Sequence, residues 1–282
     1  MSQSRQLSQV ILVIIMMFFS AYGEGLAQNS YEQLAEKALS QAQADSLTEA
    51  LATYQEILSA YPSDHRNPLI LTNIGQILER IGQDHEALHQ YDTALNTLPD
   101  NVPILTYRAN LFLKMGNWER AHRDYSHILD LDPQHRQSLT YRAYIDMRQH
   151  HYEEAKQDYT KVLSLYPDDE TARAGYAVLL QEMGKLSEAI QQLSVLVEQH
   201  PERTEYLVMR AEIEAANSQP ELALYDLDKA IEKDKSNKDY YLKRGYLLYE
   251  GRKYRAAHAD FEQAVKLGVP RDTLKNLLKK GK

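Results

Sequence analysis

The sequence predicts an all-α protein, a right-handed superhelical solenoid of about seven helix-turn-helix repeats followed by a C-terminal capping helix. The first observation is that residues 102–135 and 136–169 are two versions of one sequence, in which Tyr107 aligns with Tyr141. The second is that one alanine returns at a spacing of about 34 residues. It occupies Ala87, Ala121, Ala155, Ala189, Ala223 and Ala257. A solenoid of this kind buries the apolar faces of its helices between neighbouring repeats.

Three further columns of residues keep the same register. A small residue stands at a fixed distance before each alanine, at Gly75, Ala109, Ala143, Ala177, Ala211 and Gly245. A large residue lies four positions after each of these alanines, at Tyr91, Tyr125, Tyr159, Leu193, Leu227 and Phe261. A proline closes most repeats, at Pro62, Pro99, Pro133, Pro167 and Pro201. Small residues let paired helices approach, and proline stops the second helix.

These columns resemble the tetratricopeptide repeat family, and the resemblance covers nearly everything after about Asn29. It implies that the first helices of successive repeats form the inner wall of the superhelix. In the family this concave wall is the usual peptide-binding surface. The family's carboxylate clamp uses lysine and asparagine there, but only Asn110 fits, because Thr106 and Thr140 occupy the expected lysine positions.

The repeats divide the chain into an irregular start, a regular middle and a cap. Residues 30–67 are predicted to form an irregular first repeat, because three extra residues near His65 displace its small pair from the common register. Residues 68–271 are expected to form six regular repeats. Residues 272–282 are predicted to form a capping helix, with an apolar stripe of leucines over the last repeat and lysines toward water.

Residues 1–27 have the layout of a secretory signal peptide. Arg5 precedes the apolar run Val10–Phe19, and small residues such as Ala21 and Ala27 follow it. The run is shorter than the ~20 residues that span a bilayer as a helix. The chain is therefore expected to be exported, and to be periplasmic or secreted in a bacterial envelope. A retained N-terminal anchor is the alternative, and would be its sole membrane contact.

Composition and motifs argue against an enzyme. The net charge of −8 disfavours a general nucleic-acid role, which needs a basic surface. The segment His85–His89 spells the HExxH pattern of zinc peptidases, but it contains the packing residue Ala87 and no third ligand follows at the expected spacing. No phosphate loop or nucleophile arrangement is found. The predictions are therefore no catalytic residue, no metal, no cofactor and no small-molecule substrate.

An arginine in the first helix recurs with an aspartate in the second. Where the arginine is missing, as at Ile74 or Tyr176, the aspartate is missing too. Because an unpaired buried charge is costly, this coupling predicts structural ion pairs between paired helices. The pairs are Arg108 with Asp124, Arg142 with Asp158, Arg210 with Asp226, and Arg244 with Asp260.

The inner face of the first helices is the predicted binding site. Its residues lie on one helical stripe, and the central part of the stripe is apolar and aromatic while the C-terminal part is acidic. They are Thr72, Gln76, Glu79, Arg80, Thr106, Asn110, Leu113, Lys114, Thr140, Tyr144, Met147, Arg148, Val178, Glu212, Tyr246 and Tyr249. These features predict a non-enzymatic scaffold that binds a protein or peptide segment in the groove. The alternative is a structural subunit of an envelope or secretion assembly that docks through its ends or convex face.

Overall fold

The computed structural model describes residues 26–280, and in this range all regular secondary structure is helical. The predicted signal segment, residues 1–27, lies almost entirely outside the described residues. From Leu26 to Lys280, no helix is long and apolar enough to cross a membrane. The described chain separates into two compact units, which meet in sequence between Pro133 and Gln134.

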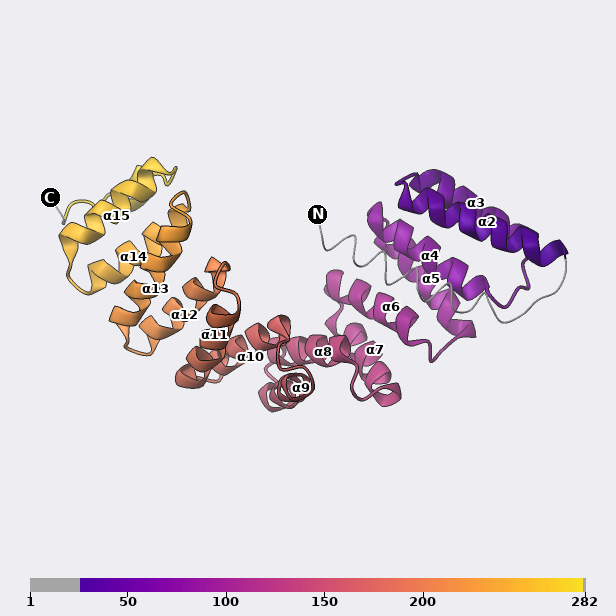
Figure 1. The fold of residues 1–282 in the computed structure, drawn as a ribbon, viewed down its shortest axis with the longest axis horizontal. Coiled ribbons are helices and arrows are strands. Elements are labelled where there is room, and N and C mark those ends of the chain that lie inside the picture. The colour runs from indigo at the N-terminus through magenta and orange to yellow at the C-terminus, as the bar shows by residue number, and fades with distance from the viewer. Residues whose placement is uncertain (1–25, 281–282) are drawn as a thin grey trace. The chain divides into compact units, whose positions relative to one another are not determined.

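Unit 1 contains three helix pairs, in which each first helix packs against the second helix that follows it (Figure 1). The irregular first repeat is the pair α2 and α3, and the linker that follows it ends where α4 begins. The six helices are α2 (Leu26–Gln43), α3 (Leu47–Ala60), α4 (Asn67–Arg80), α5 (Asp84–Thr97), α6 (Val102–Lys114) and α7 (Trp118–Leu131).

Unit 2 contains four further pairs and the C-terminal segment (Figure 1). Its helices are α8 (Arg136–Arg148), α9 (Tyr152–Leu165), α10 (Glu170–Glu182), α11 (Leu186–Gln199), α12 (Thr204–Ala216), α13 (Pro220–Lys233), α14 (Lys238–Glu250) and α15 (Tyr254–Lys266). The prediction of an all-α solenoid of helix pairs is thereby confirmed for the described chain.

The repeating small and large residues form the core of each pair. Every alanine of the second-helix column, from Ala50 to Ala257, is fully buried, and the large residue four positions later is buried with it. The fit is close. A Cβ atom added to Gly75 would lie 2.5 Å from the Tyr91 ring, and one added to Gly245 would lie 2.7 Å from Phe261. Aromatic side chains of the second helices therefore require small residues opposite them.

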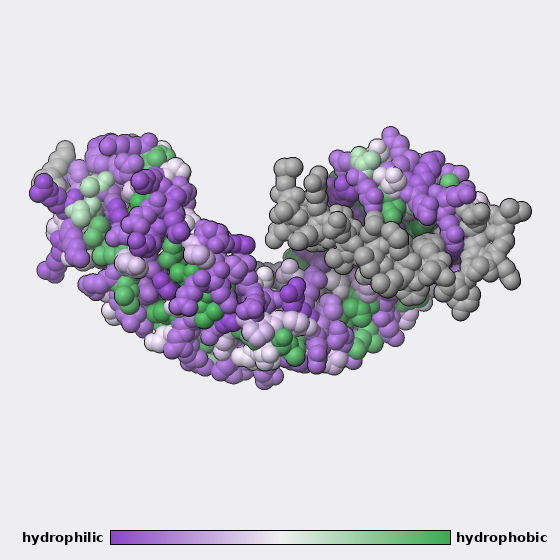
Figure 2. Space-filling view, in the orientation of Figure 1, coloured by the Kyte–Doolittle hydropathy of each residue, from purple (hydrophilic) through white to green (hydrophobic). Residues whose placement is uncertain are grey.

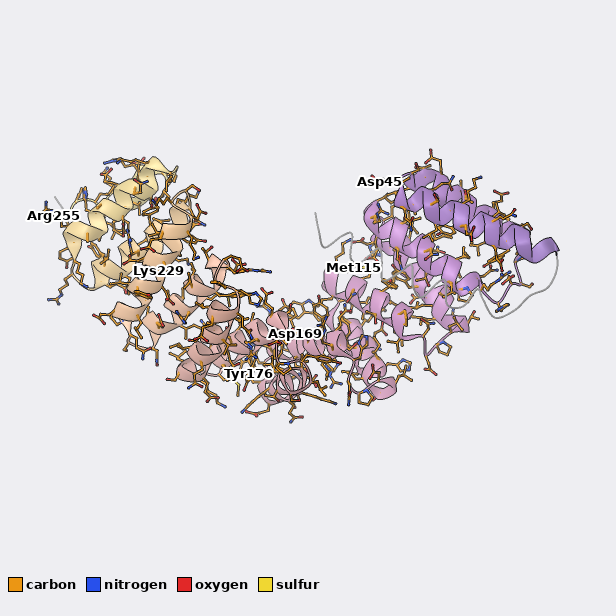
Figure 3. All side chains as sticks on the ribbon, viewed as in Figure 1. Asp45, Met115, Asp169, Tyr176, Lys229 and Arg255 are labelled. Atoms are coloured by element: carbon orange, nitrogen blue, oxygen red, sulfur yellow. The ribbon has the colours of Figure 1, made fainter. Side chains whose placement is uncertain are left out.

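The ends of the helices follow from local sequence. Asp169, labelled in Figure 3, precedes α10, and its carboxylate accepts a hydrogen bond from the Ala172 backbone N–H at 2.8 Å. This is N-capping, which satisfies a free donor of the first turn. Between paired helices the chain adopts positive φ, at Gly82 in the second repeat and at His150 in the fourth. The turn of the fourth repeat thus keeps the left-handed backbone without glycine.

The C-terminal segment covers the last repeat, but not as the predicted helix. Residues Arg271–Leu274 form a 3₁₀-helix, and the chain continues in turns to Lys280. Leu274 and Leu278 are buried in a cluster with Tyr241 and Phe261. The leucines cover the last repeat as predicted, but the predicted capping helix is a short 3₁₀-helix followed by turns.

Candidate protein-binding face

The candidate site is the surface formed by the first helices of the six regular pairs, from α4 to α14, called here the first-helix face. In unit 1 it comprises α4 and α6, and in unit 2 it comprises α8, α10, α12 and α14. All the residues predicted from the sequence to line a groove lie on these helices. The two units divide them into two separate sets, eight in each unit.

Arginine and aspartate side chains fix each first helix to its second helix beneath this face. In all four predicted pairs the guanidinium donates two hydrogen bonds to the two carboxylate oxygens, at distances between 2.6 and 2.9 Å. The aspartates are buried, and Asp226 is 1% exposed. Two-point contacts between Arg and carboxylate also fix the relative orientation of the two groups. The first helices are therefore held in place without using the exposed side of the face.

The same arginines also reach the preceding repeat. Arg108 donates to Asp92 at 2.8 Å and Arg244 donates to Asp228 at 2.6 Å, each from the nitrogen that its own pair leaves free. Arg210 donates to the Ser194 hydroxyl at 3.1 Å in the same way. Each of these three guanidinium groups thus joins three helices, which explains why the residue recurs in a stack of repeats.

In unit 1 the polar residues of the first-helix face are bonded to neighbouring tyrosines. The Tyr91 hydroxyl donates to the Glu79 carboxylate, and the Tyr125 hydroxyl donates to the Asn110 side-chain oxygen at 2.7 Å. Gln76 is hydrogen-bonded to Tyr107, whose pKa is raised mainly by burial. Burial likewise raises the pKa of Glu79 above its ordinary value. These residues stabilise the packing of the pairs.

The two basic residues predicted to flank the unit 1 groove are also paired. Arg80 donates to Asp45 at 2.7 Å, across the turn between α2 and α3 where Figure 3 labels that aspartate. Lys114 donates to Asp84 at 2.5 Å. Both contacts join a first helix to the preceding repeat. Among the uncharged predicted residues, the hydroxyls of Thr72 and Thr106 donate to backbone carbonyls of their own helices.

Three residues predicted to contact a partner are largely buried. Thr72, Thr140 and Met147 are each below 8% exposed. These side chains point toward neighbouring helices rather than toward solvent, because the predicted stripe covers a wider part of each helix than the part that is exposed. The prediction that they line a groove is corrected accordingly. Leu113, Val178 and Tyr249 are half-buried.

In unit 2 the face keeps exposed aromatic and charged groups. Tyr144 on α8 and Tyr246 on α14 are 37% and 46% exposed. Arg148 and Glu212 are exposed too. In Figure 2 the surface of this unit is mostly hydrophilic, with hydrophobic residues showing between the charged ones. Large exposed aromatic side chains are enriched where proteins bind one another.

A pocket of about 280 Å³ opens on this face between α12 and α14. Leu227 of α13, Ala215 and Leu247 provide apolar walls, and Tyr246 stands beside them. Glu212, Lys243 and Glu250 provide the charged groups. Lys243 donates a hydrogen bond to Glu212, so the two facing helices are linked across the opening. A pocket of this size suits one or two side chains of a bound segment rather than a larger ligand.

Two acidic residues at otherwise apolar first-helix positions are buried in unit 2. The Asp146 carboxylate lies 3.6 Å from His151. The Glu214 carboxylate lies 3.7 Å from Arg210, and one of its oxygens has no hydrogen-bond partner. Burial, together with the charge of Asp226, raises the pKa of Glu214 to about 7. Both neighbours belong to the same repeat as the carboxylate, since Arg210 lies one turn earlier on α12 and His151 lies in the turn between α8 and α9.

The histidines of the zinc-peptidase pattern lie apart from any candidate metal ligand set. His85 and His89 are exposed on α5, and Ala87 between them is fully buried in the pair α4 and α5. Nowhere in residues 26–280 do three His, Asp or Glu side chains gather in an arrangement that could hold a metal ion.

Six of the eight residues that line the pocket were not among the binding residues predicted from the sequence: Ala211, Ala215, Leu227, Lys243, Leu247 and Glu250. One signal for Lys243 was available. The equivalent position in the other regular repeats is Asn73, Tyr107, Tyr141, Gly175 or Met209, so Lys243 is the one charged residue in its column. Leu227 occupies the packing column and gave no such signal.

Comparison with protein families gives two matching models, both described as tetratricopeptide repeat. One matches residues 108–170 and the other residues 146–213. Comparison with curated protein sequences gives no match.

Solved structures with the same fold extend the similarity beyond these repeats. A tetratricopeptide repeat protein from Parabacteroides merdae is 28% identical, with a TM-score of 0.69 over 90% of this chain and 99% of that one. YrrB, described as a repeat protein with an unusual peptide-binding site, is 18% identical, with a TM-score of 0.53 over 63% and 92%. The type IV pilus biogenesis factor PilW is 16% identical, with a TM-score of 0.61 over 70% and 91%.

Proposed function

We propose that this tetratricopeptide repeat protein is a non-enzymatic scaffold that holds a segment of a partner protein against the first-helix face of unit 2. The observation that carries the proposal is the pocket between α12 and α14, which lies on this face and is lined by Glu212 and Tyr246. Exposed Tyr144 and Tyr246 offer rigid amphipathic contact area at low entropic cost. The peptide-binding description of YrrB agrees with a use of this kind.

The proposed compartment is the bacterial envelope, either the periplasm or the cell exterior. Its support is the sequence alone, namely Arg5, the apolar run Val10–Phe19 and the small residues that follow. Fractionation of the source cell, with N-terminal sequencing of the mature protein, tests it. A mature chain beginning near Gln28 in the soluble envelope fraction is expected. Recovery of the uncut chain in the membrane fraction would instead identify residues 1–27 as an anchor.

Site-specific photo-crosslinking tests the binding face. A photoreactive amino acid is placed at Tyr144 or Tyr246 on the first-helix face of unit 2, and at Gln157 or Gln191 as exposed second-helix controls. One protein should be crosslinked from the first-helix positions and should then bind the purified chain directly. Crosslinks obtained only from the control positions would contradict the proposal.

The second candidate function is that of a subunit that docks into an envelope assembly through its ends or its second-helix face. The observation in its favour is on α13, where Leu222 and Tyr225 are 51% and 58% exposed. The corresponding residues of the fourth repeat are Glu154 and Gln157, both polar. The crosslinking experiment separates the two functions, because Gln157 and Gln191 lie on the second helices of the same unit.

A further inference from the structure

We propose that the pocket between α12 and α14 binds a lysine or arginine side chain of the partner segment. The proposal rests on the proposed function, because it assigns the chemistry of the residue that anchors the segment. It follows from the charge at the rim of the pocket, from its apolar walls and from the aromatic ring beside it.

The rim of the pocket has an excess of negative charge. Its charged groups are two carboxylates, Glu212 and Glu250, and one ammonium group, Lys243. The Lys243 ammonium group forms an ion pair with the Glu212 carboxylate. The exposed Glu250 carboxylate takes part in none of the ion pairs found between Leu26 and Lys280. A bound cation would therefore meet an available carboxylate, whereas a bound anion would be repelled.

Acidic residues also lie elsewhere along the face. Glu182, at the end of α10, and Asp239, in the first turn of α14, are exposed first-helix residues of the same unit. Glu205 of α12 is also exposed, although Arg203 lies 3.2 Å from its carboxylate. Exposed basic residues, Arg148 of α8 and Lys238 of α14, lie among these carboxylates on the first helices. The excess of negative charge that favours a basic ligand is therefore a property of the pocket rim rather than of the whole face.

The walls of the pocket suit the aliphatic part of a basic side chain. Ala215, Leu227 and Leu247 form an apolar lining below the charged rim. Lysine and arginine bury their methylene groups along apolar surface while the charged end stays near water. A purely apolar side chain would fill the same lining but would leave Glu250 beside it without a counter-charge.

The Tyr246 ring adds a second interaction with a cation. It stands at the pocket, and its other contact is edge-on to Phe261, with the ring centroids 5.3 Å apart. Tyr249 lies one turn after Tyr246 on α14. The ammonium group of Lys280, in the C-terminal segment, lies 5.4 Å from the centre of the Tyr249 ring and 5.5 Å from that of Tyr254. A lysine of this chain thus already uses a neighbouring tyrosine as a cation–π partner.

The test begins with random peptides displayed on phage and selected against the purified chain from Gln28 to Lys282. Selected peptides should be enriched in lysine or arginine at one position. Replacing that residue by glutamine in a synthetic peptide should weaken binding about tenfold. Enrichment of aromatic or acidic residues without a basic one would overturn the proposal.

Variants of the protein then locate the effect. Glu250→Gln should weaken the basic peptide about threefold to tenfold, and Glu250→Lys should weaken it further. The matched control Glu154→Gln removes an exposed carboxylate of the same unit from α9, and should leave the affinity unchanged. Equal affinities for wild type and Glu250→Gln would overturn the proposal. Circular dichroism melts should coincide for all these variants, because the replaced side chains are exposed.

Failure of the underlying function gives a different result. If the selected peptides bind Tyr144→Ala and Tyr246→Ala as tightly as wild type, they do not use the first-helix face of unit 2. That outcome would overturn the proposed function together with the assignment of the pocket. If these two substitutions weaken binding but Glu250→Gln does not, the face binds a segment and only the basic anchor is wrong.

Discussion

The first-helix faces of units 1 and 2 use equivalent repeat positions for different purposes. In unit 1, Asn110 accepts a hydrogen bond from Tyr125 of the second helix. In unit 2, the equivalent position carries the exposed Tyr246, which lines a pocket. A polar residue on a repeat face is thus a weak indicator of binding until its internal partners are known. The Asn110 side chain is thus hydrogen-bonded within the fold, whereas the Tyr246 ring at the equivalent position is exposed.

The largest expected effect concerns the feature that the two units share, the buried ion pair. Asp226→Ala in unit 2 and Asp124→Ala in unit 1 should each lower the free energy of unfolding by about 3 kcal/mol, because a largely buried guanidinium loses its two-point carboxylate partner and keeps only its contact with the preceding repeat. Urea denaturation followed by circular dichroism measures the loss. The control is Asp228→Ala, whose half-exposed carboxylate should contribute under about 1 kcal/mol. If the Asp226 and Asp228 variants unfold alike, the pair does not stabilise the core.

A pH dependence should distinguish unit 2 through Glu214. Its pKa of about 7 in the folded chain lies above the value of about 4.3 expected when unfolded. The protonated form is therefore favoured by folding, and its contribution to stability is complete below about pH 4.3 and is lost as the pH rises through about 7. At pH 8, the free energy of unfolding of the Glu214→Gln variant should be about 1–3 kcal/mol higher than that of wild type. Parallel stability profiles of the two proteins from pH 5 to 8 would contradict this.

The contrast between the faces themselves predicts unequal costs for removing polar groups. Asn110→Ala leaves the Tyr125 hydroxyl without this acceptor, and should lower the free energy of unfolding by about 1–3 kcal/mol. Glu250→Gln, in unit 2, should change it by less than about 0.5 kcal/mol. Thermal melts of both variants measure the difference. An equal loss of stability in Asn110→Ala and Glu250→Gln would contradict the view that Asn110 stabilises the fold and Glu250 does not.

The smallest expected effect is at the exposed ion pair between Lys114 and Asp84. Lys114→Gln should lower the free energy of unfolding by about 0.2–1 kcal/mol at low salt, and by less in 1 M NaCl, where the charges are screened. Urea titrations at the two salt concentrations provide the comparison. A salt-independent loss would show that the lysine contributes by packing its methylene groups.

The repeats, the helix pairs and the ion-pair partners could be read from the sequence because each depends on a pattern that recurs. The alanine column sets the register, and the arginines appear only with their aspartates. The structure places those partners in two-point contact, as between Arg210 and Asp226. A physical constraint that acts on every repeat leaves several copies of its evidence in one chain.

The side chains of the first-helix face that are exposed for binding could not be predicted in the same way, because their exposure depends on contacts that differ from repeat to repeat. Whether Glu79 is exposed depends on the reach of the Tyr91 hydroxyl, and the column of this tyrosine holds leucine or phenylalanine in the last three repeats. Met147 has the helical position of a groove residue but packs inward. The sequence predicted the apolar contacts of the C-terminal cap but not its backbone conformation. Burial of Leu274 and Leu278 constrains the positions of the side chains more than the backbone that carries them.

Hydrogen–deuterium exchange of the mature chain, with and without a selected peptide, tests the central claim most directly. The account predicts slower exchange of backbone amides in the first helices of unit 2, above all α12 and α14, and unchanged exchange in α4 and α6 of unit 1. Slower exchange confined to α4 and α6, or to the second helices, would contradict the assignment of the binding face to unit 2.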